Sequence, residues 1–164
     1  TKKHVHLVGH SYGAAMALEA ACELGPKVQS LTLVEPVSFN LLRVEGRPEW
    51  TEIEKLGVAV LSAVSNGQDR EAAAAFMRYW LGRLRWWLSP EKFKEAITAT
   101  IHKVALEFMI IIEADKKLSA YASVTVPTLL IAGGKTPAPT RAVVDMLGAT
   151  LPNAEVTASR ARAI

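Results

Sequence analysis

The chain alternates short apolar stretches with longer segments in which apolar residues recur at helical spacing. Three of the apolar stretches are rich in β-branched residues and end near turn-forming residues, which predicts buried strands at 3–8, 28–34 and 126–132. The Ala-rich segment 14–24 is dense in helix formers and ends at Gly25-Pro26, which predicts a helix. Strand, helix and strand in this order predict parallel pairing through a right-handed crossover.

A long, mostly helical segment separates the second predicted strand from the third. Apolar residues have helical spacing over 49–64 and 69–82. Ser89-Pro90-Glu91 supplies a cap, a first-turn proline and an acidic first turn for a helix expected to run to about Lys117. We interpret this segment as an insertion that forms a lid.

The end of the chain predicts one more helix and a short extended segment. Thr140 is expected to cap a helix that runs to about Leu151, after which Pro152-Asn153 turns the chain into an extended segment at 154–157. The whole pattern predicts one structural domain with an insertion. Its expected parts are a strand–helix–strand core, a helical lid, and a last core strand and helix with the tail, at 1–36, 37–125 and 126–164.

Composition narrows the classes of function. The net charge is +3 and the basic residues are spread among helical segments, so no nucleic-acid partner is expected. The longest apolar run, within 104–112, contains Glu107 and is far shorter than the ~20 residues of a membrane span, so none is expected. The single Cys22 and a start without signal-peptide features favour a reducing, cytoplasmic compartment. Because no metal-ligand spacing and no phosphate-binding loop occur, we expect neither a metal nor another cofactor.

The stretch that carries chemistry is Gly9-His10-Ser11-Tyr12-Gly13, a Gly-x-Ser-x-Gly pentapeptide between a predicted strand and a predicted helix. Glycine is expected at 9 and 13 because the serine occupies a strained turn, where side chains at both positions would collide with the adjoining strand and helix. The turn would place the Ser11 hydroxyl beside a helix N-terminus, with the Tyr12 N–H as the first oxyanion donor. The alternative is a chance pentapeptide in a loop, and the flanking strand and helix argue against it.

These residues resemble the nucleophile elbow of the α/β-hydrolase superfamily, especially of its lidded, esterase-like members. The resemblance covers nearly the whole chain, including Leu33-Val34-Glu35-Pro36, the helical insertion, the strand ending at Gly133 and the segment 151–155. It implies a partial α/β-hydrolase fold, with a short parallel sheet of about three strands flanked by helices and a helical lid. It also implies hydrolysis of a small-molecule ester or related acyl substrate, with Ser11 as the nucleophile. In the family the elbow follows the fifth strand, so the earlier strands and the loop with the second oxyanion donor are expected to be missing, as in a truncated member.

The catalytic acid that the resemblance implies is not in its usual place. The family carries it after the strand that here ends at Gly133-Gly134, but residues 135–140 contain no carboxylate. Some members carry the acid after the preceding strand, where this sequence has Glu35, which is therefore the candidate for orienting a catalytic imidazole. An ordinary loop carboxylate is the alternative interpretation of Glu35, and Asp145, inside a predicted helix, is a weaker candidate.

The histidine that the resemblance implies is missing as well. A serine hydroxyl needs a neighbouring base, which in this family is a histidine late in the chain, yet none follows His102. His4, His6, His10 and His102 are each expected to be structural. Read two bases on with permitted synonymous codons, the tail 156–164 gives Asp-Gly-Phe-Pro-Gly-Ala-Gly-His, which looks like the family's approach to its histidine. A frameshift is therefore one hypothesis for the altered tail.

Aromatic and basic residues gather in the helical insertion. Its aromatic residues and Met77 have two interpretations, core packing or the lining of an apolar pocket, and helical spacing favours core packing; they are Phe76, Tyr79, Trp80, Trp86 and Trp87. Arg78, Arg83 and Arg85 are expected to form a solvated face.

Two hypotheses of function follow from these features. The first is a serine hydrolase in which Ser11 attacks an acyl substrate, the Tyr12 N–H holds the oxyanion and Glu35 orients a histidine supplied elsewhere. The second is an inactive or weakly active hydrolase fragment that persists as a folded homo-oligomer. An oligomer is expected because strands that are apolar on both faces would otherwise expose a large apolar surface and an open sheet edge.

Overall fold

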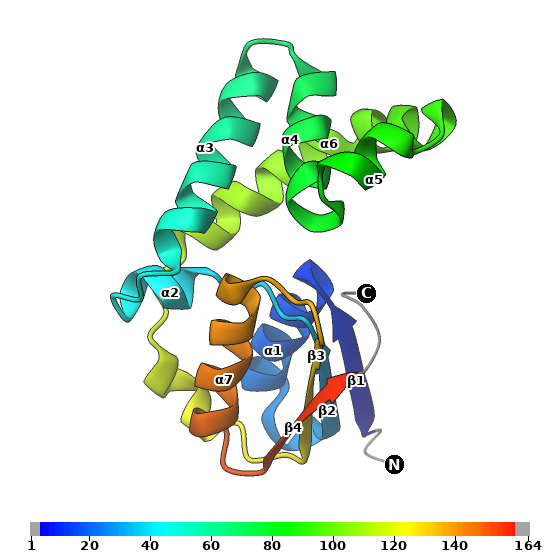
Figure 1. The fold of residues 1–164 in the computed structure, drawn as a ribbon. Helices are drawn as coiled ribbons and strands as arrows, with labels where there is room; N and C mark the ends of the chain where they lie inside the picture. The colour runs from blue at the N-terminus through cyan, green and yellow to red at the C-terminus, as the bar shows by residue number, and fades with distance from the viewer. Residues whose placement is uncertain (1–3, 160–164) are drawn as a thin grey trace. The chain divides into compact units, whose positions relative to one another are not determined.

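The computed structural model describes residues 4–159, which divide into two compact units (Figure 1). Residues up to Trp50 and from Asp115 onward form a unit that contains the β-sheet, here called the sheet unit. Residues 51–114 form a second unit that contains only helices, here called the helical unit. The sheet unit therefore includes both ends of the predicted insertion 37–125, and only its middle part forms the second unit.

The sheet is parallel throughout and its strand order follows the chain. Its strands are β1 (Val5–His10), β2 (Val28–Val34), β3 (Thr128–Gly133) and β4 (Ala154–Ser159). The α/β class and the parallel pairing predicted from sequence are confirmed. The sheet has four strands, not about three, because the extended segment predicted at 154–157 pairs along the length of β3, with Val156 opposite Leu130.

Five short or medium helices complete the sheet unit. They are α1 (Tyr12–Leu24), η1 (Gly25–Lys27), α2 (Asn40–Val44), η2 (Leu118–Ser123) and α7 (Ala138–Thr150), where η marks 3-10 helices. α1 packs on β1 and β2, and α7 packs on β3 and β4. The expected cap of α7 is wrong: the helix begins at Ala138 after Pro137, so Thr140 lies buried inside its first turn. Pro139 fits in this first turn because the first N–H groups of a helix have no partner within the helix.

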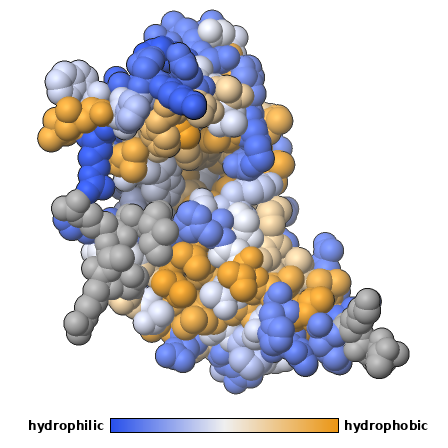
Figure 2. Space-filling view, turned by 90° about the vertical axis from the view of Figure 1, so that its right-hand side faces the viewer, coloured by the Kyte–Doolittle hydropathy of each residue, from blue (hydrophilic) through white to orange (hydrophobic). Residues whose placement is uncertain are grey.

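The two faces of the sheet differ in how they are covered. α1 and α7 lie on one face of the sheet (Figure 1). Leu33 and its register partner Leu130 are fully buried. On the other face Thr32 and its partner Leu129 are only half-buried, and Val8, opposite Thr32 on β1, is 73% exposed. Figure 2 shows apolar residues at the surface of the sheet unit. Among its described residues, the sheet unit therefore covers one face of its sheet with helices and leaves apolar residues of the other exposed.

The helical unit is built from four helices. They are α3 (Trp50–Ser65), α4 (Asp69–Leu81), α5 (Arg83–Leu88) and α6 (Glu91–Glu113). Small and branched residues such as Ile53, Ala73 and Ile101 are fully buried in its core. α6 begins where Ser89-Pro90-Glu91 predicted and ends earlier than the expected Lys117. No helix in the described part of the chain is both long enough and apolar enough to cross a membrane.

The chain leaves and re-enters the sheet unit at neighbouring places. The Leu118 N–H donates to Glu45 Oε1 at 3.0 Å, and the buried Asn40 side chain donates to the Lys116 carbonyl at 3.4 Å. Lys116 Nζ also donates to Glu19 Oε2 on α1 at 2.6 Å, and the Tyr121 hydroxyl donates to the other oxygen of the same carboxylate. These contacts hold the segment 116–121 against α1 and against the C-terminal end of α2.

The carboxylate of Glu19 changes the acid–base behaviour of its two partners. Burial alone would lower the pKa of Lys116, but the hydrogen bond and charge of Glu19 outweigh burial and leave that pKa above its ordinary value. Burial raises the pKa of the Tyr121 hydroxyl, and Glu19 raises it further. Lys116 therefore stays charged and Tyr121 stays neutral to a higher pH than they would in the unfolded chain.

Candidate active site

Ser11 lies at the turn between β1 and α1, in a conformation that is unusual for a residue with a side chain. Its φ is 54° and its ψ is −123°, a combination that costs a non-glycine residue ~1–3 kcal/mol. The Ser11 N–H donates to the Val34 carbonyl at 2.9 Å, and the Ser11 carbonyl accepts from the N–H groups of Ala14 and Ala15. The turn is thus held on one side by β2 and on the other by the first turn of α1.

The two glycines that flank Ser11 have different surroundings. A Cβ added to Gly9 would lie 2.3 Å from the Gly13 carbonyl oxygen and 2.6 Å from the Ala14 backbone, so no side chain fits at Gly9. A Cβ added to Gly13 would have no neighbour within 4 Å. The expectation of a clash at both positions is therefore wrong for Gly13. The backbone of α1 passes close to the Cα of Gly9. The Cα of Gly13 has open space around it.

Tyr12 and His10 border Ser11 on either side. Tyr12 is the first residue of α1 and half-buried, so its N–H belongs to the helix N-terminus, where the helix dipole favours negative charge. His10 is the last residue of β1 and is exposed. The first strand was predicted to end at Val8, but Gly9 and His10 continue its pairing with β2.

Glu35 follows β2 directly and lies next to the Ser11 turn. His10 pairs with Val34 in the sheet, so Ser11 and Glu35 are the next residues along two adjacent strands. Glu35 has a φ of 47°, is 5% exposed, and donates its N–H to the Ile131 carbonyl at 2.8 Å. Ser11 and Glu35 are the non-glycine residues with positive φ in the described part of the chain. Strain is therefore concentrated at the carboxyl edge of the sheet.

The loop after β3 holds the Glu35 carboxylate. The Gly133 N–H donates to Glu35 Oε1 at 3.1 Å, and the Thr136 hydroxyl donates to the same oxygen. Arg141 in turn donates to the Gly133 carbonyl at 2.6 Å. The sequence shows no carboxylate in this loop, and the hydrogen bonds that the loop donates to Glu35 were not predicted. A hydroxyl residue two positions after the Gly133-Gly134 turn is the signal that was available.

The remaining candidates lie elsewhere. Asp145 is exposed on α7. His6 Nδ1 is 2.7 Å from the Ser30 hydroxyl, His4 is exposed just before β1, and His102 pairs with Asp69 at 3.0 Å inside the helical unit. Within residues 4–159, the structure gives Ser11 and Glu35 no hydrogen bond to a histidine. Residues 160–164, the end of the altered tail, lie outside the described residues.

The site has the chemistry of a hydroxyl, a carboxylate and a helix N-terminus. In the described part of the chain no three His, Cys, Asp or Glu residues are grouped so that they could hold a metal ion. Burial raises the pKa of the Cys22 thiol, which keeps that residue in its less nucleophilic form. Ser11 and Glu35 place a hydroxyl and a buried carboxylate at the ends of two adjacent strands.

Comparison with known proteins agrees with this geometry. A family model described as the alpha/beta hydrolase fold matches residues 1–161, so the chain belongs to the α/β-hydrolase family. No curated protein sequence matches the chain.

Solved structures of hydrolases share the fold at low sequence identity. An alpha/beta hydrolase from Sphaerobacter thermophilus is 20% identical over 99% of this chain and 63% of its own, with a TM-score of 0.61. A hydrolase from Pseudomonas aeruginosa is 22% identical over 98% of this chain and 58% of its own, with a TM-score of 0.68. An esterase from Exiguobacterium antarcticum is 16% identical over 95% of this chain and 58% of its own, with a TM-score of 0.68. The chain thus spans about three fifths of the length of these structures.

Proposed function

We propose that this chain carries the nucleophile of a serine hydrolase that acts on a small-molecule ester or related acyl substrate. The observation that carries the proposal is the conformation of Ser11, a strained residue between a strand end and a helix N-terminus in a family of hydrolases. Such strain persists only where the surrounding structure enforces it, and it is concentrated at functional positions. Ser11 is the proposed nucleophile and the Tyr12 N–H, at the start of α1, the proposed oxyanion donor.

Glu35 is the proposed acid that orients the catalytic base. Its place at the end of the neighbouring strand and its two donors, Gly133 and Thr136, support this role. Two fixed donors bind one oxygen of this buried carboxylate and so hold its other oxygen in a defined direction. An acid that orients a histidine needs such a fixed oxygen. The base itself would be a histidine from a segment or chain outside the described residues.

Labelling with a fluorophosphonate tests the nucleophile. An activated Ser11 should form one covalent adduct, located by peptide mass spectrometry, that Ser11→Ala abolishes. Ser123→Ala is the matched control, because Ser123 is an exposed serine of the same unit, and it should label like the parent chain. Labelling that is equal in all three proteins, or absent from the parent chain at high reagent, would remove Ser11 from this role.

A second candidate is an inactive or weakly active hydrolase fragment that persists as a folded homo-oligomer in the cytoplasm. The absence of a histidine bonded to Ser11 within residues 4–159 favours it. Free imidazole distinguishes the two, because it can replace a missing base. Imidazole also reacts with a short-chain nitrophenyl ester by itself, and the rate measured with Ser11→Ala gives this background. If only the base is missing, imidazole should raise the hydrolysis rate of the parent chain above that background. Rates equal to that background would favour the inactive fragment.

A further inference from the structure

The helical unit contains a groove of its own between α4, α5 and the start of α6. It has a volume of about 640 Å³ and nine lining residues, among them Arg78, Arg83, Leu84, Trp86, Trp87 and Lys94. Pockets that bind organic molecules commonly have volumes of ~300–1,000 Å³. Every lining residue belongs to the helical unit, so the groove exists independently of the sheet and of Ser11.

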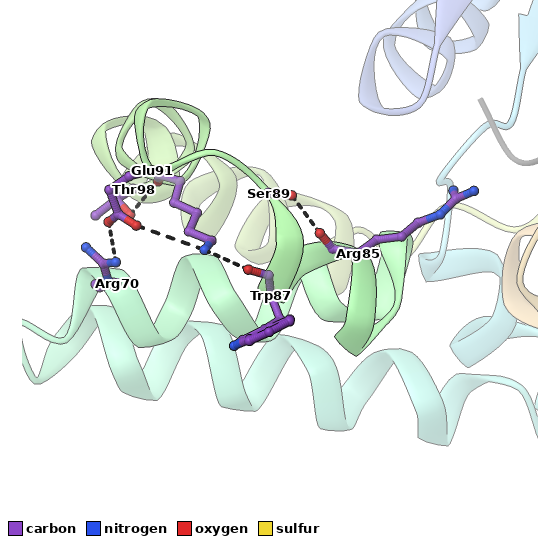
Figure 3. Close-up of polar contacts among 7 residues, drawn as sticks. Arg70, Arg85, Trp87, Ser89, Glu91 and Thr98 are labelled. Atoms are coloured by element: carbon purple, nitrogen blue, oxygen red, sulfur yellow. Dashed lines mark hydrogen bonds and ion pairs between the residues drawn. The ribbon is translucent and has the colours of Figure 1, made fainter.

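The charge of the groove is unbalanced. Four of its nine lining residues are cationic and one is an acid. Glu91 pairs with Arg70 (Figure 3). One of its oxygens also lies 4.0 Å from Lys94 Nζ, so one carboxylate is shared by both cations. Among residues 4–159, neither Arg78 nor Arg83 has an ion-pair partner. The groove therefore carries two guanidinium groups whose charge an anion would balance.

The same groove has an apolar wall. Trp86 lines the groove and is buried in a cluster with Ala74 and Met77, while Leu84 and Trp87 are 67% and 72% exposed. Lys94 Nζ donates to the Trp87 carbonyl at 3.1 Å and lies 5.9 Å from the centre of the Trp86 ring, so α6 holds α5 in place at this point. Exposed indole and leucine side chains beside a buried tryptophan form a surface on which an apolar body can pack without rearrangement.

The backbone explains why the two unpaired arginines share the groove. Arg78 is in the last turn of α4 and Arg83 is the first residue of α5. Gly82 joins the two helices with a φ of 82°, a conformation that glycine adopts easily, and its N–H donates to the Arg78 carbonyl at 3.0 Å. The turn brings the end of one helix beside the start of the next.

We propose that this groove binds an organic carboxylate with an aromatic or acyl body. The carboxylate would pair with Arg78 and Arg83, whose planar guanidinium groups fit its two oxygens, and the apolar body would lie against Trp87 and Leu84. A cationic groove of this size without the aromatic wall would suit small inorganic anions, and the wall without the arginines would suit neutral apolar molecules. The combination selects an amphipathic anion.

Calorimetric titration of the full chain with 2-naphthoate tests the proposal, with 2-naphthamide as the neutral molecule of the same shape. We expect naphthoate to bind about tenfold more tightly than the amide, because charge-assisted hydrogen bonds to arginine are lost in the amide. The double variant Arg78→Gln/Arg83→Gln should remove this difference. Arg85→Gln is the matched control: Arg85 is on α5 but outside the lining, and it extends away from Trp87 and Arg70 (Figure 3). Its affinity should equal that of the parent chain.

Four results with the parent chain and the arginine variants would overturn the proposal, and a fifth comes from Ser11→Ala. They are equal binding of the amide, no binding of naphthoate, equal loss in Arg85→Gln, and tighter binding of a glutamate-rich peptide than of naphthoate at the same carboxylate concentration. Circular dichroism of the double variant checks that both substitutions, at exposed positions, leave the helices intact. Ser11→Ala should bind naphthoate unchanged, and loss of binding there would place the ligand at Ser11 instead. The result is therefore independent of whether Ser11 is a nucleophile.

Discussion

The Cα of Gly9 lies so close to the backbone of Gly13 that an added Cβ would be 2.3 Å from the Gly13 carbonyl oxygen. This contact brings the start of α1 against the end of β1 and fixes the turn that carries Ser11. The constraint acts on one glycine of the pair, because the Cα of Gly13 has open space around it.

Substituting the two glycines should therefore give opposite results. Gly9→Ala forces the backbone at Gly13 and Ala14 to move, which should cost about 1–3 kcal/mol or more of unfolding free energy. Gly13→Ala, in the first turn of α1, should leave stability unchanged or raise it by up to ~1 kcal/mol, because alanine favours the helix. Urea unfolding of both variants measures the difference. Similar losses in the two would show that the close approach is not what fixes the turn.

The strain at Ser11 predicts that glycine is the most stable residue there. The values φ 54° and ψ −123° mirror an ordinary extended conformation, which glycine adopts without steric cost. We expect Ser11→Gly to be more stable than Ser11→Ala by about 1 kcal/mol, since alanine keeps the strain and lacks the hydroxyl as glycine does. Thermal unfolding of both variants tests this, and an alanine variant at least as stable as the glycine variant would contradict it.

Variants of Glu35 should show whether the acceptor oxygen or the negative charge of its carboxylate stabilises the loop after β3. Glu35→Ala leaves the buried Gly133 N–H without a partner and should cost about 1–3 kcal/mol of unfolding free energy. Glu35→Gln keeps an acceptor oxygen and should cost less than half as much. Thr136→Val is the control that removes only the hydroxyl donor. If the glutamine variant is as unstable as the alanine variant, the negative charge itself holds the loop.

The free energy of unfolding should fall at alkaline pH because Lys116 and Tyr121 both donate hydrogen bonds to Glu19. Lys116 and Tyr121 both have a folded pKa above the ordinary value, so the stability that they contribute is complete below the unfolded pKa values of about 10 and is lost as the pH rises through the folded values. The melting temperature should therefore fall above about pH 10. Glu19→Gln should reduce this dependence, whereas Glu23→Gln, an exposed glutamate on the same helix, should leave it unchanged. A pH profile that is the same in all three proteins would contradict the role of Glu19.

The exposed face and edge of β1 predict self-association. Val8 is 73% exposed, and within the described residues β1 pairs with β2 alone. We expect a homo-oligomer, most simply a two-fold dimer in which each chain covers this surface of the other. Val8→Glu should dissociate it with an unchanged circular dichroism spectrum, and Val58→Glu, at an exposed position of the helical unit, should not. A folded, monodisperse monomer of the parent chain in sedimentation at micromolar concentration would refute the prediction.

The sequence predicted most of the elements because their signals are local. The bounds of β2, 28–34, were predicted correctly, since an apolar run there is preceded by Gly25-Pro26 and followed by Glu35-Pro36. The end of β1 was placed two residues early, because glycine is read as a strand end although Gly9 here continues the pairing. The strand pairing of 154–159 depends on β3 and could not be known from that segment alone.

The candidate site was predictable only in part. The pentapeptide around Ser11 is a contiguous motif, so its place between strand and helix could be predicted. The donors to Glu35 come from Gly133 and Thr136, about a hundred residues away in the chain, and no local pattern marks such a contact. The open space at Gly13 was likewise not predictable, because it depends on which backbone passes near each Cα.

The contact between Glu45 and Leu118 has a consequence for how the chain can be rebuilt. Because the hydrogen bond joins the segments just before and just after the helical unit, we expect that a short linker between 46 and 117 would leave the strands in place. The helical unit is in this sense an exchangeable cassette, and cassettes from other hydrolases could be grafted between these two positions while the sheet keeps its register. We expect residues 51–114 to tolerate changes in length and sequence for the same reason, because the turn at Ser11 belongs to the other unit.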